Sequence, residues 1–156
     1  MAAFFKLTVQ SFWGDYRAVM NVLLFPGTID DYTKAFWKSC KKHILIFQQC
    51  NDCGHIRWPL SFICPKCSSQ KTEWIQSEGK GCVYTYIVFH TPFHPDFIGK
   101  TPYTVAIIDL KEGPHFLAKI IGCNHTQIQC DMEVEVVWED VSSELSLPNF
   151  KPLTLR

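Results

Sequence analysis

Two Cys-x-x-Cys pairs are the residues of this sequence best suited to chemistry: Cys50, Cys53, Cys64 and Cys67. Each pair can form a tight turn that presents two thiolates to one face of a metal ion, and two such turns complete a tetrahedral four-sulfur site. Gly54 follows the first pair and Pro65 lies inside the second, and both residue types favour tight turns. The spacing therefore predicts a zinc ribbon. The alternatives are two disulfides or four separate buried thiols.

So short a segment would be hard to order without a metal. The predicted metal is a structural zinc ion, because the short loop and a reducing compartment suit a zinc ribbon. A four-thiolate site can also hold iron. Four further cysteines show no disulfide spacing: Cys40, Cys82, Cys123 and Cys130. Unpaired thiols and metal-binding thiolates are typical of a reducing compartment, so we expect a cytoplasmic location.

The segment before the first cysteine pair predicts a helix that ends near Lys42. Thr28 and Asp31 form a pattern like a capping box, with a hydroxyl at the start and a carboxylate three residues later. Apolar side chains then recur on one face, and lysines fill the last turn, which suits the helix dipole. Short strands are predicted around the cysteine pairs, over 43–48, 56–59 and 71–76.

Beyond a glycine-rich joint at 78–81, β-branched and aromatic residues dominate the sequence. Strands are predicted over 83–89, 103–110, 116–121 and 132–139, with a long loop over 91–102. This pattern indicates a small Greek-key barrel such as an OB-fold. The proline-rich tail 147–152 is expected to pack as an extended strap without regular structure. The fold class is therefore mostly β, with an N-terminal arm and helix (1–42), a ribbon (43–78) and an OB-fold domain with its strap (79–156).

The composition excludes disorder and gives little sign of a membrane segment. Of the 156 residues 47% are hydrophobic, and 15 Lys and Arg balance 15 Asp and Glu. The apolar runs of residues 1–25 are interrupted by polar and charged side chains, so neither a signal sequence nor a membrane span is predicted. An amphipathic docking segment, or a start codon assigned too early, would explain them.

A catalytic role for the chain itself has weak support. Cys82 or Cys123 could in principle pair with a histidine as an activated nucleophile. Both cysteines lie in or beside predicted strands, where a free cysteine usually serves as a small core residue. No catalytic residue is therefore assigned.

Several stretches, in this order, carry a resemblance to a known family: Phe36-Trp37, the two cysteine pairs with Gly54 and Pro65, Trp74, 79–81, 102–106, 109–113, 132–134 and 147–152. Over about residues 30–152 the sequence resembles the rubredoxin-like zinc-ribbon/OB-fold acyl-CoA-associated proteins, the domain of unknown function 35 (DUF35) family. The resemblance implies a non-catalytic accessory or scaffold subunit, part of a hetero-oligomer with a thiolase-type or related acyl-CoA-processing enzyme. It also implies that a coenzyme A thioester is the ligand.

Two groups of residues are candidates for facing acyl-CoA or the partner enzyme. The basic helix could meet coenzyme A phosphates, and the aromatic segment 89–97 could form a hydrophobic lip. The alternative for that segment is a loop folded back over the barrel as satellite core. The candidates are Lys38, Lys42, Phe89, His90, Phe93, Phe97 and Tyr103.

The alternative function is single-stranded nucleic-acid binding, since OB-folds often serve it. Such binding needs a positive groove lined with aromatic side chains. The aromatics are present, but residues 83–137 hold three lysines against six acidic residues, a balance of −3. The charge therefore disfavours nucleic acid.

Overall fold

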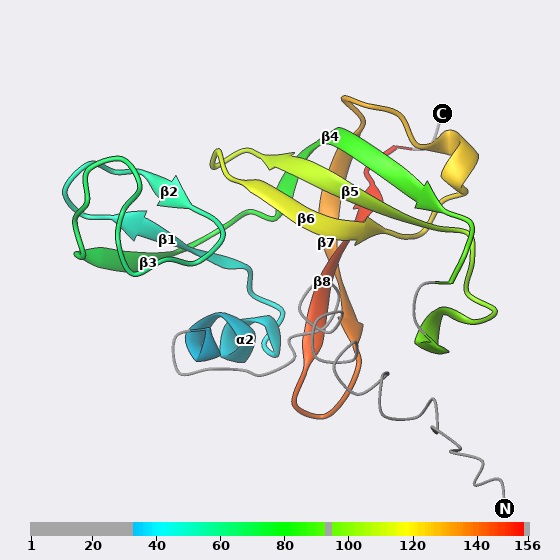
Figure 1. Cartoon of the computed structure of the whole chain (residues 1–156), viewed down its shortest axis with the longest axis horizontal. Helices are drawn as coiled ribbons and strands as arrows, with labels where there is room; N and C mark the ends of the chain where they lie inside the picture. The colour runs from blue at the N-terminus through cyan, green and yellow to red at the C-terminus, as the bar shows by residue number, and fades with distance from the viewer. Residues whose placement is uncertain (1–32, 93–94, 155–156) are drawn as a thin grey trace, which may run out of the picture.

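The computed structural model describes residues 33–92 and 95–154 (Figure 1). The short helix α2 (Lys34–Cys40) precedes a three-stranded antiparallel sheet in the order β2-β1-β3. Five further strands close into a barrel in the order β4-β5-β6-β8-β7. The strand bounds are β1 Ile46–Cys50, β2 Ile56–Arg57, β3 Thr72–Gln76, β4 Lys80–Phe89, β5 Tyr103–Leu110, β6 His115–Ile120, β7 Glu133–Asp140 and β8 Ser146–Pro152.

The barrel has the strand order of an OB-fold, which confirms the predicted fold class. Its ladders are antiparallel except for β6 and β8, which run parallel where Ile120 pairs with Phe150. Alternate side chains of each strand fill the interior, as the two-residue period of a strand requires. On β5 these are Ala106 and Ile108, each no more than 1% exposed.

The strand β8 corrects the prediction that the proline-rich tail lacks regular structure. The main chain of Phe150 faces β6, because its carbonyl accepts a hydrogen bond of 2.8 Å from the N–H of Ile121. Pro148 and Pro152 lie two residues to either side and so share this orientation. Their missing N–H groups therefore fall on the side away from β7, and the antiparallel ladder with β7 is intact from end to end.

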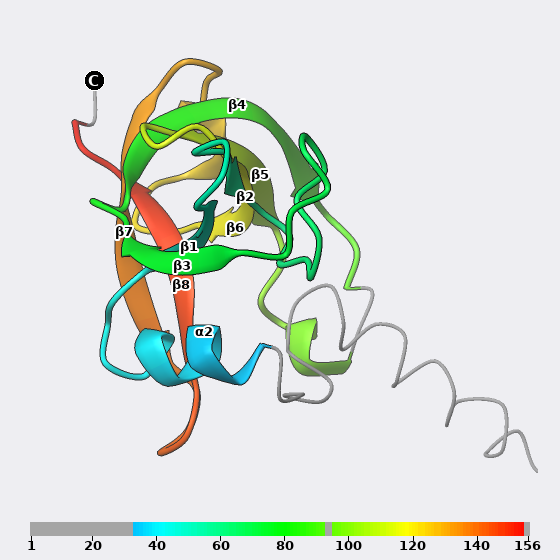
Figure 2. The same ribbon diagram turned by 90° about the vertical axis from the view of Figure 1, so that its left-hand side faces the viewer.

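The ribbon and the barrel are joined by an aromatic cluster. Phe116 of β6 lies with its ring centroid 5.8 Å from that of Phe47 and 4.9 Å from that of Trp58, and Phe36 of α2 lies 4.7 Å from Trp58. All four belong to or pack against one hydrophobic core. Figure 2 shows α2 lying beneath the ribbon and beside β8, in agreement with its contacts to β1 and β8.

The helix ends two residues before the predicted position. After Cys40 the chain turns, and His43 adopts the left-handed conformation with φ of 60°. Two polar contacts then fasten this turn to the β7–β8 hairpin: Lys41 with Glu144 at 3.1 Å, and the His43 ring with Asp140 at 2.8 Å. The predicted helix start at Thr28 lies outside the described residues, as does the rest of the arm up to residue 32.

The glycines of the joint are required by close packing. A side chain at Gly81 would place its first carbon 2.3 Å from the carbonyl oxygen of Asp109 on β5. Gly79 has a φ of +67° and lies against Val136, whose N–H donates to its carbonyl at 2.7 Å. A side chain at either position would therefore disturb the start of β4 where it packs against β5 and β7. The predicted domain boundaries at 42/43 and 78/79 stay predictions.

Candidate metal centre

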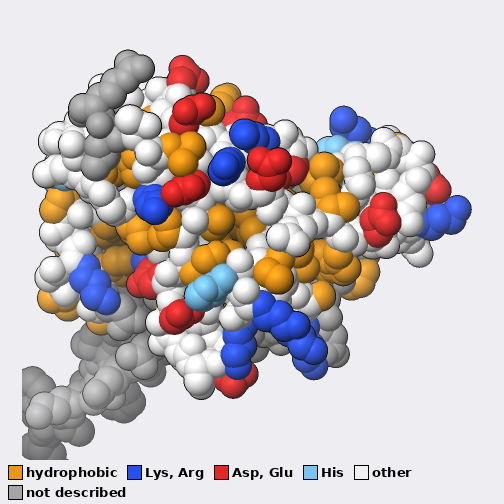
Figure 3. Space-filling view, turned by 180° about the vertical axis from the view of Figure 1, so that it is seen from behind, with side chains coloured by type: hydrophobic (Ala, Val, Ile, Leu, Met, Phe, Trp, Pro, Cys, Tyr) orange, Lys and Arg blue, Asp and Glu red, His pale blue; other side chains and the backbone are white. Residues whose placement is uncertain are grey.

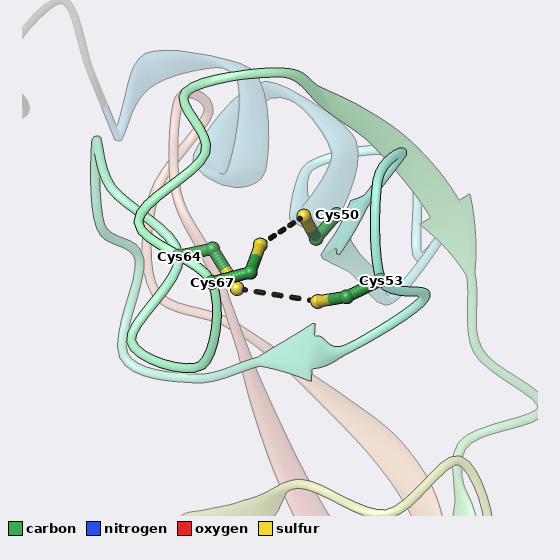
Figure 4. A group of neighbouring side chains, drawn as sticks. All are labelled: Cys50, Cys53, Cys64 and Cys67. Carbon is green, nitrogen blue, oxygen red and sulfur yellow. Dashed lines mark hydrogen bonds between the residues drawn. The ribbon is translucent and has the colours of Figure 1, made fainter.

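The four cysteines predicted as ligands converge on one point (Figure 4). The sulfur atoms of Cys50 and Cys67 are 3.5 Å apart, those of Cys53 and Cys64 are 3.6 Å apart, and all four lie within 4.8 Å of one another. A tetrahedron with zinc–sulfur bonds of about 2.3 Å places neighbouring sulfurs about 3.8 Å apart. The geometry and the donor type therefore fit a zinc ion.

The two cysteine turns repeat the same local structure. In the first, the N–H of Gly54 donates to the carbonyl of Cys50 at 2.8 Å, and in the second the N–H of Ser68 donates to Cys64 at 2.9 Å. Both donor residues are left-handed, with φ of 71° and 60°. Glycine adopts this conformation without strain, whereas serine does so at some cost. The predicted role of Gly54 in the turn is thus supported, and Ser68 shows that the second turn keeps the same geometry without glycine.

A buried amide ties the ribbon together behind the cysteines. The side-chain oxygen of Gln48 accepts hydrogen bonds from the Nε of Arg57 at 3.0 Å and from the N–H of Ser61 at 3.2 Å. It thereby joins β1, β2 and the segment that leads to the second cysteine pair. Gln48 and Arg57 are 2% and 3% exposed, and among the described residues the two terminal guanidinium nitrogens of Arg57 have no hydrogen-bond partner. Sequence reasoning missed this pair.

The thiols are too crowded to ionise together without a cation. Burial acts to raise the pKa of the Cys64 thiol, but the N–H groups of Lys66 and Cys67 and the thiols of Cys53 and Cys67 lower that pKa to about 6. The N–H of Ser69 favours the Cys67 thiolate, yet the neighbouring thiols and burial raise the pKa of Cys67 to about 12. A divalent metal supplies the charge that lets all four bind as thiolates.

Acidification is therefore expected to release the metal. Metal binding displaces thiol protons, so a higher proton concentration opposes it. Below pH 6 even the Cys64 thiol, the one whose pKa lies at about 6, is protonated in the metal-free chain. We expect zinc transfer to a chromophoric chelator to be slow at pH 7.5 and to become rapid and complete as the pH falls below about 5 to 6. A zinc content that is independent of pH between 4 and 8 would contradict a thiolate site.

The candidate residues for acyl-CoA or partner contact divide into two places. Lys38 and Lys42 lie exposed on α2 and the turn after it, and Figure 3 shows lysine and arginine side chains gathered there below a band of hydrophobic side chains. The other group lies at the far end of β4 and β5. The structure does not bring the two groups into one pocket among the residues it describes, and their shared role stays a prediction.

The aromatic group forms a stack. The ring of Tyr103 lies 5.0 Å from that of Phe89 and 4.5 Å from that of Phe97, centroid to centroid. Phe97 is 6% exposed, which favours satellite core for that side chain. His90 is exposed, with its ring 5.8 Å from that of His125. Phe93 lies outside the described residues.

The described residues contain no helix that is both long enough and apolar enough to span a bilayer.

Two family models match consecutive parts of the described chain. Residues 37–73 match the model of the ChsH2 rubredoxin-like zinc ribbon domain, and residues 74–139 match the ChsH2 C-terminal OB-fold domain. Among solved structures, one titled "Ltp2-ChsH2(DUF35) aldolase" is similar with a TM-score of 0.75 and 33% identity, over 81% of this chain and 98% of that one. A DUF35 protein of unknown function from Sulfolobus solfataricus, at 15% identity and a TM-score of 0.58, shares the fold.

Curated relatives include subunits of larger enzymes and small scaffold proteins. A probable enoyl-CoA hydratase alpha subunit of Thermomonospora curvata is 37% identical over 119 residues, which cover 76% of this chain and 37% of that protein. The benzoylsuccinyl-CoA thiolase subunit BbsA of Thauera aromatica is 32% identical over 92 residues, covering 56% of this chain and 58% of BbsA. A DUF35 domain-containing scaffold protein of Methanocaldococcus jannaschii is 38% identical over 111 residues, covering 69% of this chain and 77% of the relative. With its zinc ribbon, its OB-fold barrel and this degree of identity, the chain belongs to the DUF35 family.

Proposed function

We propose that this chain is a non-catalytic, acyl-CoA-binding scaffold subunit of a thiolase-type or related acyl-CoA-processing enzyme complex. In this proposal Cys50, Cys53, Cys64 and Cys67 hold a structural zinc ion. One observation carries the functional part: the matched region makes up 37% of a hydratase alpha subunit but 77% of a protein described as a scaffold. The same module thus occurs as part of a longer, probable enoyl-CoA hydratase subunit and as most of a small scaffold protein.

The zinc ion would have a purely structural role. Four thiolates complete its coordination, and a closed site leaves no open position for a water or a substrate. The residues of this chain would then position the ribbon and α2 against the barrel through the Phe116 cluster. Acyl-CoA would meet the exposed lysines of α2 with its phosphates, and the partner enzyme would supply the catalytic groups.

A binding titration with and without added salt separates this function from nucleic-acid binding. Acyl-CoA presents only a few phosphate charges, so its affinity should fall gently with salt. An oligonucleotide contacting several phosphates should lose affinity steeply. We expect the full chain, together with its partner enzyme, to bind an acyl-CoA with shallow salt dependence and a ten-nucleotide single strand weakly. Tight, salt-sensitive oligonucleotide binding without an acyl-CoA response would overturn the proposal.

Removing charge from α2 tests the phosphate contact. The double variant Lys38→Ala/Lys42→Ala should weaken acyl-CoA binding about 3- to 10-fold, since each lysine contributes a modest, partly screened attraction. Lys71→Ala/Lys111→Ala is the matched double control, because both lysines are exposed outside α2 and pair with Asp52 and Glu78. Equal losses in both variants would show that α2 has no specific contact.

A further inference from the structure

The outer side of the barrel carries an apolar surface, formed by β4, β5 and β6, the strands nearest the viewer in Figure 1. Cross-strand pairing arranges its residues in rows. One row holds Thr85, Ile107 and Leu117, and the next holds Ile87 with Val105. These positions alternate with Ala106, Ile108, Phe116 and Ala118, which belong to the buried core, so they face outward.

This outer surface exposes large side chains that strands normally turn inward. Tyr84, Ile87 and Leu117 are 58%, 56% and 46% exposed. We define the outer apolar face as Tyr84, Ile87, Ile107 and Leu117; Val105 lies on the same side of β5 but is only 8% exposed. At one end it continues into the half-buried rings of Phe89 and Tyr103, and the buried ring of Phe97 stacks on Tyr103. A contiguous exposed apolar surface of this kind marks an interaction site more often than isolated apolar residues do.

Two exposed carboxylates, those of Asp109 and Glu133, border the outer apolar face. In the row next to Leu117, Cys82 pairs with Asp109 on one side and with Glu133 on the other, and both acidic residues are exposed. His115 follows Asp109 in that row, and its Nε2 lies 3.7 Å from the Asp109 carboxylate. Lys119, in the row with Ile87 and Val105, is held by Glu139 at 2.7 Å. The carboxylate of Glu139 thus neutralises this lysine, and the exposed border at Asp109 and Glu133 is acidic.

We propose that the outer apolar face docks a protein subunit that presents an apolar ridge bordered by lysine or arginine. If the proposed function holds, on which this step rests, that subunit is the acyl-CoA-processing enzyme. The exposed carboxylates of Asp109 and Glu133 favour a partner that carries lysine or arginine beside its apolar ridge. Phosphate groups would be repelled by Asp109 and Glu133, and a second copy of the same face would bring acidic borders together.

The first experiment identifies the occupant. Full-length chain carrying Leu117→p-benzoylphenylalanine is expressed in its native cells and irradiated, and adducts are identified by mass spectrometry. Val141→p-benzoylphenylalanine is the control, because Val141 is 44% exposed but follows β7, outside the outer apolar face. We expect position 117, and not position 141, to crosslink to an acyl-CoA-processing enzyme subunit. No adduct at 117, or adducts only with other copies of this chain, would overturn the proposal.

The second experiment measures binding to the crosslinked protein after purification. Leu117→Glu should weaken binding at least about 100-fold, as expected for a buried apolar contact at an interface centre, while Val141→Glu should change it less than about 3-fold. Asp109→Lys should slow association and flatten its salt dependence. All variants should keep their zinc content and melting temperature, since the altered side chains face outward. Unchanged binding by Leu117→Glu would overturn the docking surface.

The two proposals fail in different ways. If the enzyme subunit binds the chain but Leu117→Glu has no effect, the proposed function stands and the docking surface falls. If position 117 crosslinks to a protein that does not process acyl-CoA, and Leu117→Glu abolishes that binding, the docking surface stands and the proposed function falls.

Discussion

Replacing Cys50 or Cys64 with serine is expected to release the metal and unfold the ribbon. Both thiols are 1% exposed, so water cannot replace the lost ligand without opening the structure. A serine hydroxyl stays protonated near neutral pH and is a poor zinc ligand. Structural zinc contributes an apparent free energy of about 10 to 16 kcal/mol in small zinc domains, which is comparable to the total stability of a single domain. Losing one ligand should therefore remove most of the ribbon's stability.

Two measurements check this expectation. Elemental analysis should give about one zinc per chain for the unaltered protein and much less for either variant. Limited proteolysis should then cut first between residues 43 and 76. Cys130→Ser is the control, since Cys130 is an exposed free cysteine outside the cluster. Full metal occupancy in the double Cys50→Ser/Cys64→Ser variant would exclude these residues as ligands.

Most of this fold could be predicted because the strands are rich in β-branched and aromatic residues. The run from Tyr103 to Leu110 has the period and composition of a strand, and β5 has these bounds. The cysteine spacing likewise predicted four converging thiols. The prediction for the tail 147–152 was wrong because it considered the number of prolines and not the orientation of each one. Whether a proline breaks a strand depends on which side its missing N–H faces, and that is set by the neighbouring strands.

Features that depend on packing between distant segments could not be predicted from the sequence. Gln48 and Arg57 look like solvent-exposed polar residues in the sequence, yet both are buried behind the metal site. The only local hint was the run of glutamines in β1, which does not say that the segment around Ser61 folds over it. In the same way the outer apolar face becomes visible only when the register of β4, β5 and β6 is known, because its residues come from three separate strands.

Phe116→Ala is expected to destabilise the whole chain by about 3 to 5 kcal/mol, the usual cost of removing a buried phenylalanine from a packed core. The Phe116 ring is 3% exposed and lies beside Phe47, Trp58 and Phe150, so one truncation opens a cavity where ribbon, helix and barrel meet. The melting temperature should fall by many degrees. Zinc content should stay near one per chain, because the four ligands belong to the ribbon alone.

The neighbouring residue gives the control for this prediction. Leu117 lies on the same strand with the same β-sheet environment but faces outward, so Leu117→Ala should cost less than about 1 kcal/mol. Similar losses of stability in the two variants would show that the cluster does not join the modules. A loss confined to Phe116→Ala, accompanied by faster hydrogen exchange in both β1 and β6, would mean that the ribbon and barrel fold as one cooperative unit. The ribbon could then transmit the position of a bound partner to the barrel, because neither part could move without breaking the contact at Phe116.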